Sequence, residues 1–211
     1  MSVKKDTYKI QAQTIIKNLA RRNMEGFYCD TKEDAVKKAL EIMEKGSVIA
    51  WGGSESIKEC GLMEAISDGS YELIDRTKAV TPDEQRKLYA SIVMSDYYLM
   101  STNAITLEGE LVNIDGNGNR VAALIHGPAH VLIIAGMNKV TADVESGYKR
   151  VKEAACPPNA VRLKKEIPCA LTGCCADCLA PQCFCNQIVV TRRSGHEGRI
   201  KIILVGEELG Y

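Results

Sequence analysis

The sequence predicts a single α/β domain. Helical and strand patterns alternate along the chain, which is the arrangement that gives a layered α/β fold. The length of 211 residues suits one domain with a sizeable core. The composition, with 45% hydrophobic and 26% charged residues, is that of an ordinary globular protein.

The first half of the chain predicts amphipathic helices and short buried strands in alternation. Aliphatic residues recur at helical spacing in residues 7–23 and again in residues 31–45. Strands are predicted at three apolar runs, which are residues 47–51, 71–74 and 97–101, and a short apolar piece lies at residues 26–29.

Two further helices are expected to start between these strands. One begins near Ser54–Ser56, and Ser56 has capping-box spacing with Glu59. The other begins at Thr81-Pro82-Asp83-Glu84, because a capping Thr precedes Pro at the first helical position and a carboxylate at the third. We expect this second helix to end near Ser95.

The pattern changes in the second half of the chain. Residues 105–114 and 120–125 are apolar runs separated by Asp115-Gly116-Asn117-Gly118-Asn119. Gly and Asn favour positive φ, so we expect a hairpin turn between the two runs. A strand at 131–135 and a helix at 141–155 are predicted to follow.

Charge and hydropathy exclude several classes of partner. Acidic and basic residues balance at 27 each, so no net positive field attracts nucleic acid or an anionic membrane. The N-terminal residues lack the apolar core of a signal peptide. No apolar run reaches the ~18 residues of a membrane span. We therefore expect a soluble, cytoplasmic protein.

The cysteines are the most informative feature. Of nine in the chain, six lie between Cys169 and Cys185, and an odd count without a secretion signal argues against a disulfide framework. Cys175 and Cys178 form a C-x-x-C pair, whose short loop lets two thiolates face one metal. We predict a metal centre held by Cys169, Cys175, Cys178 and one of Cys183 or Cys185.

The type of centre is open. Zinc needs four thiolates and an iron–sulfur cluster needs one per iron, and the spacing does not choose between them. Adjacent Cys174 and Cys175 could instead support a thiol–disulfide switch. Plain packing of free thiols is a further alternative, and it is our interpretation for Cys29 and Cys60. Cys156 also lies apart from the cluster in sequence.

A glycine turn gives a candidate anion site. Gly52-Gly53-Ser54 lies between a predicted strand and a predicted helix, so the N–H groups of Gly53 and Ser54 could bind a carboxylate or phosphate. A plain tight turn would need the same residues. Glu108 and Glu110 share a face if their run is a strand, either as catalytic carboxylates or as part of a solvated face.

Three motifs together carry a family resemblance. They are Trp51-Gly52-Gly53-Ser54, the run Thr106-Leu107-Glu108-Gly109-Glu110-Leu111-Val112-Asn113-Ile114-Asp115-Gly116, and Thr172-Gly173 with Cys175-Ala176-Asp177-Cys178. This combination resembles the LUD-domain family, proteins similar to the lactate utilisation proteins, and within it a subgroup with a Cys-rich C-terminal segment. The resemblance covers nearly the whole chain.

The resemblance implies a Rossmann-like sheet related to ribose-phosphate isomerase and CoA-transferases. In such folds the glycine turn borders the ligand pocket, and the hairpin around residues 103–115 would form another wall. The candidate ligand-binding residues are therefore Gly52, Gly53, Ser54, Ser56, Asn103, Thr106, Glu108, Glu110, Asn113 and Asp115. Residues 1–165 would form the LUD-type domain, and residues 166–211 a Cys-rich segment and terminal hairpin packed on it.

Three functions fit these features. The first is a metal- or iron–sulfur-binding, redox-linked protein of lactate or other organic-acid metabolism, because lactate utilisation relatives act in an iron–sulfur-linked oxidation of lactate to pyruvate. Its partners would be a small anionic metabolite and a redox protein. The second is an isomerase- or transferase-like enzyme with a structural zinc. The third is a non-catalytic assembly subunit.

The end of the chain predicts a homodimer. Residues 187–192 and 199–205 are β-rich runs joined by Ser194–Gly198, and we expect them to form a terminal hairpin. A lone two-stranded hairpin is marginal in water, and the run 200–205 carries aliphatic residues on both faces. The domain core can cover one face, so a second subunit is expected to cover the other.

Overall fold

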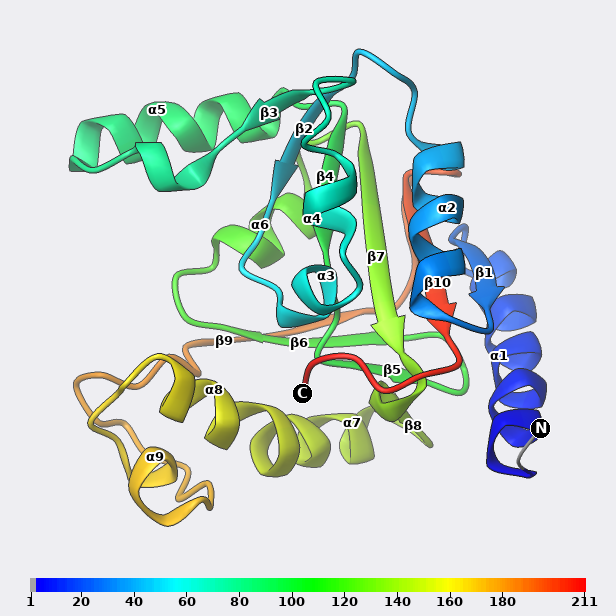
Figure 1. Cartoon of the computed structure of the whole chain (residues 1–211). Coiled ribbons are helices and arrows are strands. Elements are labelled where there is room, and N and C mark those ends of the chain that lie inside the picture. The colour runs from blue at the N-terminus through cyan, green and yellow to red at the C-terminus, as the bar shows by residue number, and fades with distance from the viewer. Residues whose placement is uncertain (1–2) are drawn as a thin grey trace.

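The computed structural model describes residues 3–211 as a three-layered α/β structure, with a six-stranded sheet between two layers of helices (Figure 1). The strand order is β1-β10-β7-β4-β2-β3, and every neighbouring pair is parallel. The strands are β1 (Glu25–Cys29), β2 (Val48–Trp51), β3 (Glu72–Ile74), β4 (Tyr97–Met100), β7 (His130–Gly136) and β10 (Ile200–Val205). The predicted Rossmann-like α/β class is confirmed.

Helices cover both faces of this sheet, because the strands of a parallel sheet are apolar on both sides. In β10, Ile202 and Leu204 pack into one apolar cluster, and Ile203 and Val205 pack into the other. The first face is covered by α1 (Val3–Arg21), α5 (Pro82–Val93) and α6 (Asn119–Ile125). The second face is covered by α2 (Lys32–Ile42), α3 (Glu55–Glu59) and α4 (Leu62–Ala65). Within residues 3–211, no helix is long and apolar enough to cross a membrane.

A second, four-stranded sheet crosses the carboxyl ends of the main strands (Figure 1). Its order is β8-β5-β6-β9. The strands are β5 (Ala104–Thr106), β6 (Leu111–Asp115), β8 (Val140–Thr141) and β9 (Gln187–Thr191). β5 and β6 form an antiparallel hairpin, and its turn uses Gly109 at φ +87°.

A long helical segment packs against this second sheet. It consists of α7 (Val144–Arg150), the π-helical turn η3 (Val151–Ala155) and α8 (Cys156–Arg162), and α9 (Pro168–Thr172) follows. Cys156 alone separates the π-helical turn η3 from Pro157 and Pro158, which have no N–H to donate to the hydrogen bonds of a regular helix. The short 3₁₀ turns η1 (Arg76–Lys78) and η2 (Met137–Lys139) follow β3 and β7.

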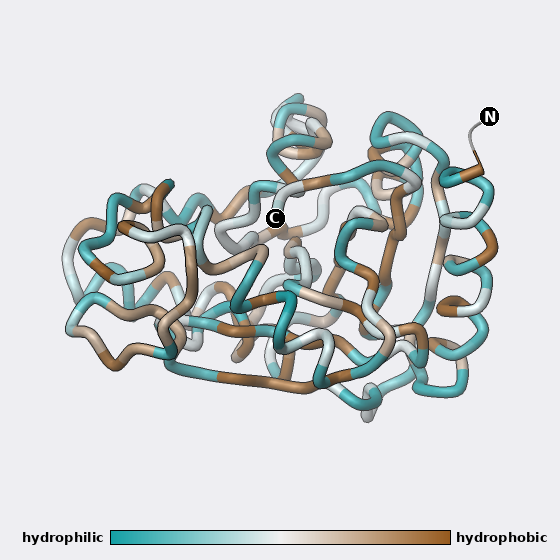
Figure 2. Tube along the Cα trace, turned by 90° about the horizontal axis from the view of Figure 1, so that it is seen from below, coloured by the Kyte–Doolittle hydropathy of each residue, from teal (hydrophilic) through white to brown (hydrophobic). Residues whose placement is uncertain are grey.

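The carboxyl ends of β2, β4 and β7 lie next to one another at the edge that faces the second sheet. After β2 the chain enters α3 on one face of the sheet, and after β3 it enters α5 on the other. Ligands of open α/β sheets bind where connections diverge in this way. Viewed from this end, the C-terminus lies near the middle of the molecule and α1 lies at its periphery (Figure 2).

The predicted hairpin turn at residues 115–119 is wrong. The hairpin turn lies earlier, at Leu107–Glu110, and Gly118 at φ +81° instead precedes α6. The run 120–125 is therefore a helix rather than a strand, and its buried residues lie against the main core. A short apolar run fits either structure, so its period could not decide between them.

The predicted terminal hairpin is also wrong. β9 pairs antiparallel with β6 in the small sheet, whereas β10 lies between β1 and β7 in the main sheet. Both faces of β10 are covered within the chain, which removes the argument for a dimer at this strand. Residues 166–211 supply a central strand of the main sheet and not a hairpin packed upon it.

Both predicted helix starts are confirmed, but only one of the two predicted capping boxes is present. Thr81 and Glu84 form a capping box at the start of α5. At α3 the capping residue is Ser54, whose hydroxyl accepts from the N–H of Ile57. Ser56 lies buried inside the first turn and its hydroxyl donates to the carbonyl of Leu209. This difference brings Ser56 to the floor of the site described next.

Candidate functional site

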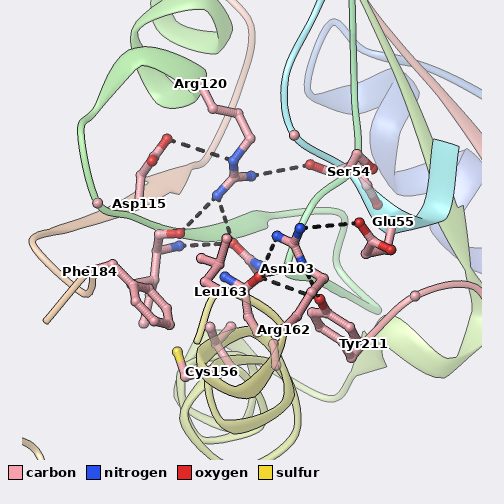
Figure 3. Close-up of a pocket in the computed structure, with 18 of the residues that line it drawn as sticks. Ser54, Glu55, Asn103, Asp115, Arg120, Cys156, Arg162, Leu163, Phe184 and Tyr211 are labelled. Carbon is pink, nitrogen blue, oxygen red and sulfur yellow. Dashed lines mark hydrogen bonds and ion pairs between the residues drawn. The ribbon is translucent and has the colours of Figure 1, made fainter. Parts of the chain in front are cut away.

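A cavity of about 400 Å³ opens at the carboxyl ends of the main-sheet strands. Its walls come from the segments after β2, β3, β4, β7 and β10, from the end of β6, and from one face of the η3–α8 helix. Residues that are far apart in sequence therefore converge on one space, as Figure 3 shows for ten of them.

The lining carries an excess of positive charge. Its basic side chains are Arg76, Arg120, Lys139, Arg162 and Lys165. Its carboxylates are Glu55 and Asp115. Five cations against two carboxylates favour an anionic ligand, because a concave wall concentrates the field of its charges.

Arg120 holds the walls together. Its guanidinium donates to the side-chain oxygens of Asn103 (2.8 Å) and Asn113 (2.5 Å), and to two backbone carbonyls. Its Nε lies 3.7 Å from Asp115, as Figure 3 shows. Four N–H donors of this side chain thus bind protein oxygens and its Nε faces Asp115, so Arg120 positions the β5–β6 hairpin and contributes charge more than it offers free donors.

Lys139 ties together the ends of three adjacent strands. It lies in η2 after β7, is only 3% exposed, and donates from Nζ to the hydroxyls of Ser56 (2.8 Å) and Ser101 (3.1 Å). Ser56 follows β2 and Ser101 follows β4. No carboxylate of residues 3–211 forms an ion pair with this ammonium, which leaves its charge uncompensated by the protein.

The surroundings of Lys139 disfavour its charged form. Burial lowers its pKa to about 7, with help from the positive charges of Arg150 and Arg120 and against a small opposing effect of Glu59. Arg150 is itself buried and donates to the carbonyls of Asn138 and Asn103. Three cations thus lie near one point in a poorly solvated region, which is the arrangement that a bound anion would stabilise.

The rim of the cavity adds further cations. Arg162 donates to the hydroxyl of Tyr211 (2.6 Å) and lies 3.4 Å from Glu55, which links α8 to the start of α3 (Figure 3). Arg76 is exposed on η1, close to Gly53. Lys165 lies beyond the end of α8 and is the third cation of the rim.

Half of the predicted ligand-binding residues lie around this cavity. Those that line it are Gly53, Ser54, Ser56, Asn103 and Asp115. Asn113 is fully buried behind the wall, where it accepts from Arg120. Gly52 also lies behind the wall, where an added side chain would meet the hydroxyl of Tyr98 at 2.9 Å.

The other three predicted residues belong to a different part of the molecule. Thr106 and Glu110 close the β5–β6 hairpin with a short side-chain hydrogen bond, and Glu110 pairs with Arg22 of the α1 C-terminus. Glu108 is exposed beside a smaller, separate pocket that includes Arg22 and Arg192. The tight turn at Gly109 carries these side chains away from the cavity, so the idea that the whole hairpin forms one wall is wrong.

The cysteine segment adjoins the same cavity. Phe184 and Cys156 line it, and the sulfur atoms of Cys156 and Cys185 are 3.5 Å apart. The backbone N–H of Cys185 points at the sulfur of Cys183 at 3.5 Å. Cys156 therefore belongs spatially to the cluster from which its sequence position separated it, because α8 brings it there.

The thiols of the segment influence one another. Burial raises the pKa of Cys169, and the negative charges of Cys175, Cys185 and Cys178 raise it further. Burial and a hydrogen bond to Cys178 likewise raise the pKa of Cys183. The hydrogen bond with Cys156 and burial raise that of Cys185.

This donor set has the chemistry that a thiolate metal centre requires, since neighbouring thiolates repel unless a cation lies between them. Among residues 3–211, however, no three His, Cys, Asp or Glu side chains already lie close enough together to hold a metal ion. Cys174 is exposed. Cys29 and Cys60 are buried in the main core, as predicted.

Sequence reasoning missed Lys139, Arg120 and Arg162. Lys139 had one visible signal, because it is a lysine four residues beyond the carboxyl end of the buried strand predicted at 131–135. Arg120 and Arg162 had none, since each lies in a helix whose partners come from distant segments.

The fold is that of a Rossmann-like α/β protein with a cavity at the carboxyl ends of its strands. The model of the LUD domain matches residues 12–205, and the chain belongs to the LUD-domain family. Among solved structures, it is similar to a DUF162 family protein from Deinococcus radiodurans, with a TM-score of 0.50 over 97% of this chain and 99% of that one. The two are 15% identical, so this similarity shows the fold alone. No curated protein matches this chain.

Proposed function

We propose that this LUD-domain protein binds a small anionic metabolite, a carboxylate or a phosphate ester, in the cavity at the carboxyl ends of β2, β4 and β7. The observation that carries the proposal is the buried Lys139 ammonium, which has hydroxyl partners but no carboxylate partner. A buried charge without a counter-charge costs several kcal/mol, so such a group is retained where a ligand supplies that charge.

The remaining lining supports an organic anion rather than a bare inorganic ion. A volume of about 400 Å³ is within the range of metabolite-sized ligands. Apolar contacts are available from Ile114, Val151 and Phe184, while the cations lie at the floor and on the rim. A molecule with an anionic end and a short carbon skeleton would use both kinds of wall.

Calorimetric titration tests this proposal with lactate, pyruvate, phosphate and sulfate. We expect at least one of them to bind the wild type, and Gly53→Val to weaken binding by narrowing the entrance. A side chain at Gly53 has room, because the nearest atom to an added Cβ is 3.5 Å away on Arg76. The matched control is Glu108→Gln, which lies outside the cavity and should leave the affinity unchanged. Equal affinity in wild type and Gly53→Val would contradict the proposed site.

We propose as a second function that the Cys169–Cys185 segment binds one zinc ion or an iron–sulfur cluster. The raised pKa of Cys169 supports it, because after burial the charges of Cys175, Cys185 and Cys178 contribute to it and a cation would relieve such repulsion. When bound, an iron–sulfur cluster would supply electron transfer, and zinc would supply a structural crosslink. Cys183, Cys185 and Cys156 are the candidates for the fourth thiolate.

Anaerobic purification followed by metal analysis tests the second function. A brown protein that absorbs at about 400 nm would support an iron–sulfur cluster. It would also support a redox-linked role in lactate or other organic-acid metabolism, with a redox partner protein. A colourless zinc protein would support the isomerase-like or assembly role instead. We expect Cys175→Ser to abolish metal binding and Cys174→Ser to preserve it. Less than about a tenth of an equivalent of iron and zinc together would contradict this function.

A further inference from the structure

The hydrogen bonds around Lys139 fix the direction of each partner. The hydroxyl of Ser56 donates to the carbonyl of Leu209 (3.1 Å), and that of Ser101 donates to the carbonyl of Thr102 (3.4 Å). A serine hydroxyl has one hydrogen, so both hydroxyls are left to accept from Lys139. Lys139 is therefore the donor in both of its bonds.

These two bonds leave one position on Nζ unused. An amine nitrogen has four tetrahedral positions, of which one is the carbon stem and two are the donated hydrogens. Within residues 3–211 no third acceptor contacts Nζ, and Lys139 lines the cavity. The remaining position is an N–H when the amine is charged and a lone pair when it is neutral.

The groups around the amine make the neutral form accessible at neutral pH. Burial disfavours its positive charge most, Arg150 from α7 and Arg120 from α6 act in the same direction, and Glu59 of α3 favours the charge. An ordinary lysine is neutral in fewer than about one molecule in a thousand at pH 7. Desolvation next to another cation is a known way to activate a lysine nucleophile.

We propose that Lys139 is a catalytic residue that forms an imine with the carbonyl carbon of a small carbonyl-bearing acid held in this cavity. The proposal rests on the proposed anion pocket and names the class of substrate that the pocket takes. Arg76, Arg162 and Lys165 on the rim would hold the acid group while the carbonyl reaches the floor.

The step is balanced without an oxidant or a reductant. The lone pair of Nζ forms a bond to the carbonyl carbon, and the π electrons move to the carbonyl oxygen, which takes a proton from the amine. The resulting carbinolamine takes up a proton from solvent on its oxygen and loses water as the nitrogen lone pair closes the C=N bond. The product is a protonated imine, and the reverse steps release the acid.

Reductive trapping tests this inference on the full-length protein. Wild type is incubated with glyoxylate and cyanoborohydride near neutral pH, and the adducts are mapped by peptide mass spectrometry. We expect Lys139 to be labelled at least about tenfold faster than any other lysine, because its amine is neutral far more often. Lys139→Arg should lose this adduct, and Lys149→Arg, a change at an exposed position on α7, should keep it.

Mapping the wild type identifies the labelled lysine even if Lys139→Arg fails to fold. Labelling spread evenly over surface lysines, or no adduct at Lys139, would overturn the inference. Calorimetric titration with glyoxylate separates the two proposals. Binding without an adduct overturns the imine and leaves the anion pocket standing. The absence of both binding and adduct overturns the inference together with the pocket.

Discussion

The burial of Lys139 is expected to weaken the fold. A lysine buried beside Arg150 and Arg120 costs stability whenever it is protonated, because neither water nor a carboxylate solvates its charge. Buried groups of this kind gather at functional sites, where a ligand offsets the cost. The unliganded protein should therefore become more stable when this charge is removed.

We expect Lys139→Met to raise the free energy of unfolding by about 1–3 kcal/mol at slightly acidic pH. In the folded wild type the pKa of Lys139 lies near 7, below the ordinary value of 10.5. Between these two pH values the unfolded chain therefore binds more protons than the folded protein does. The free energy of unfolding of the wild type should thus rise with pH across this window. The difference in stability between Lys139→Met and wild type should shrink accordingly. Urea unfolding at about pH 6.5 and about pH 9 measures both effects. A variant that is less stable than wild type at the lower pH would refute this view of Lys139.

Arg120 has the opposite effect on stability, because its buried guanidinium is hydrogen-bonded to protein oxygens. Arg120→Lys should cost about 2–4 kcal/mol of stability, because an ammonium cannot reach Asn103, Asn113 and the carbonyl of Ile114 together. It should also weaken anion binding, since Arg120 positions the β5–β6 side of the cavity. Urea unfolding and calorimetry check the two effects. Unchanged stability would mean that this hydrogen-bond network does not hold the wall.

At the element scale, the segment after β10 completes the cavity. Residues 207–211 pass close over the end of β7, where a Cβ at Gly136 would lie 2.5 Å from the nitrogen of Leu209 and 2.6 Å from the carbonyl oxygen of Glu207. Gly136 is needed for this approach and not for its backbone angles, because its φ is −67°. The segment then places Gly210 and Tyr211 in the cavity lining.

Gly136→Ala should therefore displace this segment, with a loss of about 1–3 kcal/mol in stability and weaker anion binding. Gly195→Ala is the matched control, because an added Cβ there meets nothing within 4 Å, and it should change stability by less than about 0.5 kcal/mol. Thermal unfolding and calorimetry compare the two variants. If they behave alike, the close packing of this segment on β7 is not what maintains the cavity.

The elements themselves were predictable where the local pattern was strong. The strands at 47–51, 97–101 and 131–135 and the capping box at Thr81 all agree with the structure. The errors lie where a short apolar run had two possible partners. Local pattern could not show that β9 joins β6 while β10 enters the main sheet, because each pairing spans a long stretch of sequence.

In the molecule as a whole, the cavity could be predicted only in part, because most of its walls come from segments that are far apart in sequence. The glycine turn marked one wall, because a strand–turn–helix unit is local in sequence. Lys139 gains its role only when the ends of β2, β4 and β7 become neighbours, and Cys156 gains its position only through the packing of α8. Such properties follow from topology, which one sequence does not specify residue by residue.

The homodimer stays a prediction, with a changed basis. β10 is covered on both faces within the chain, but β9 forms an edge of the small sheet and exposes Ile188 (56%) and Val190 (43%). An open edge of this kind favours pairing with another strand. Sedimentation at micromolar concentration should show a mass above the 23.1 kDa of one chain, and Val190→Lys should restore the monomer. A wild-type monomer at every concentration would refute the dimer.

If Lys139 and its neighbours bind an anion, the affinity of the protein for lactate depends on pH. Lactate has no ketone and cannot form an imine, so its affinity reports charge alone. We predict that the Kd of wild type rises at least about fivefold between pH 6 and pH 8 as Lys139 loses its proton. In Lys139→Met, binding should be weaker and independent of pH over this range. The same Kd at both pH values in wild type, or equal affinity in wild type and variant, would show that the charge of Lys139 does not contribute to anion binding.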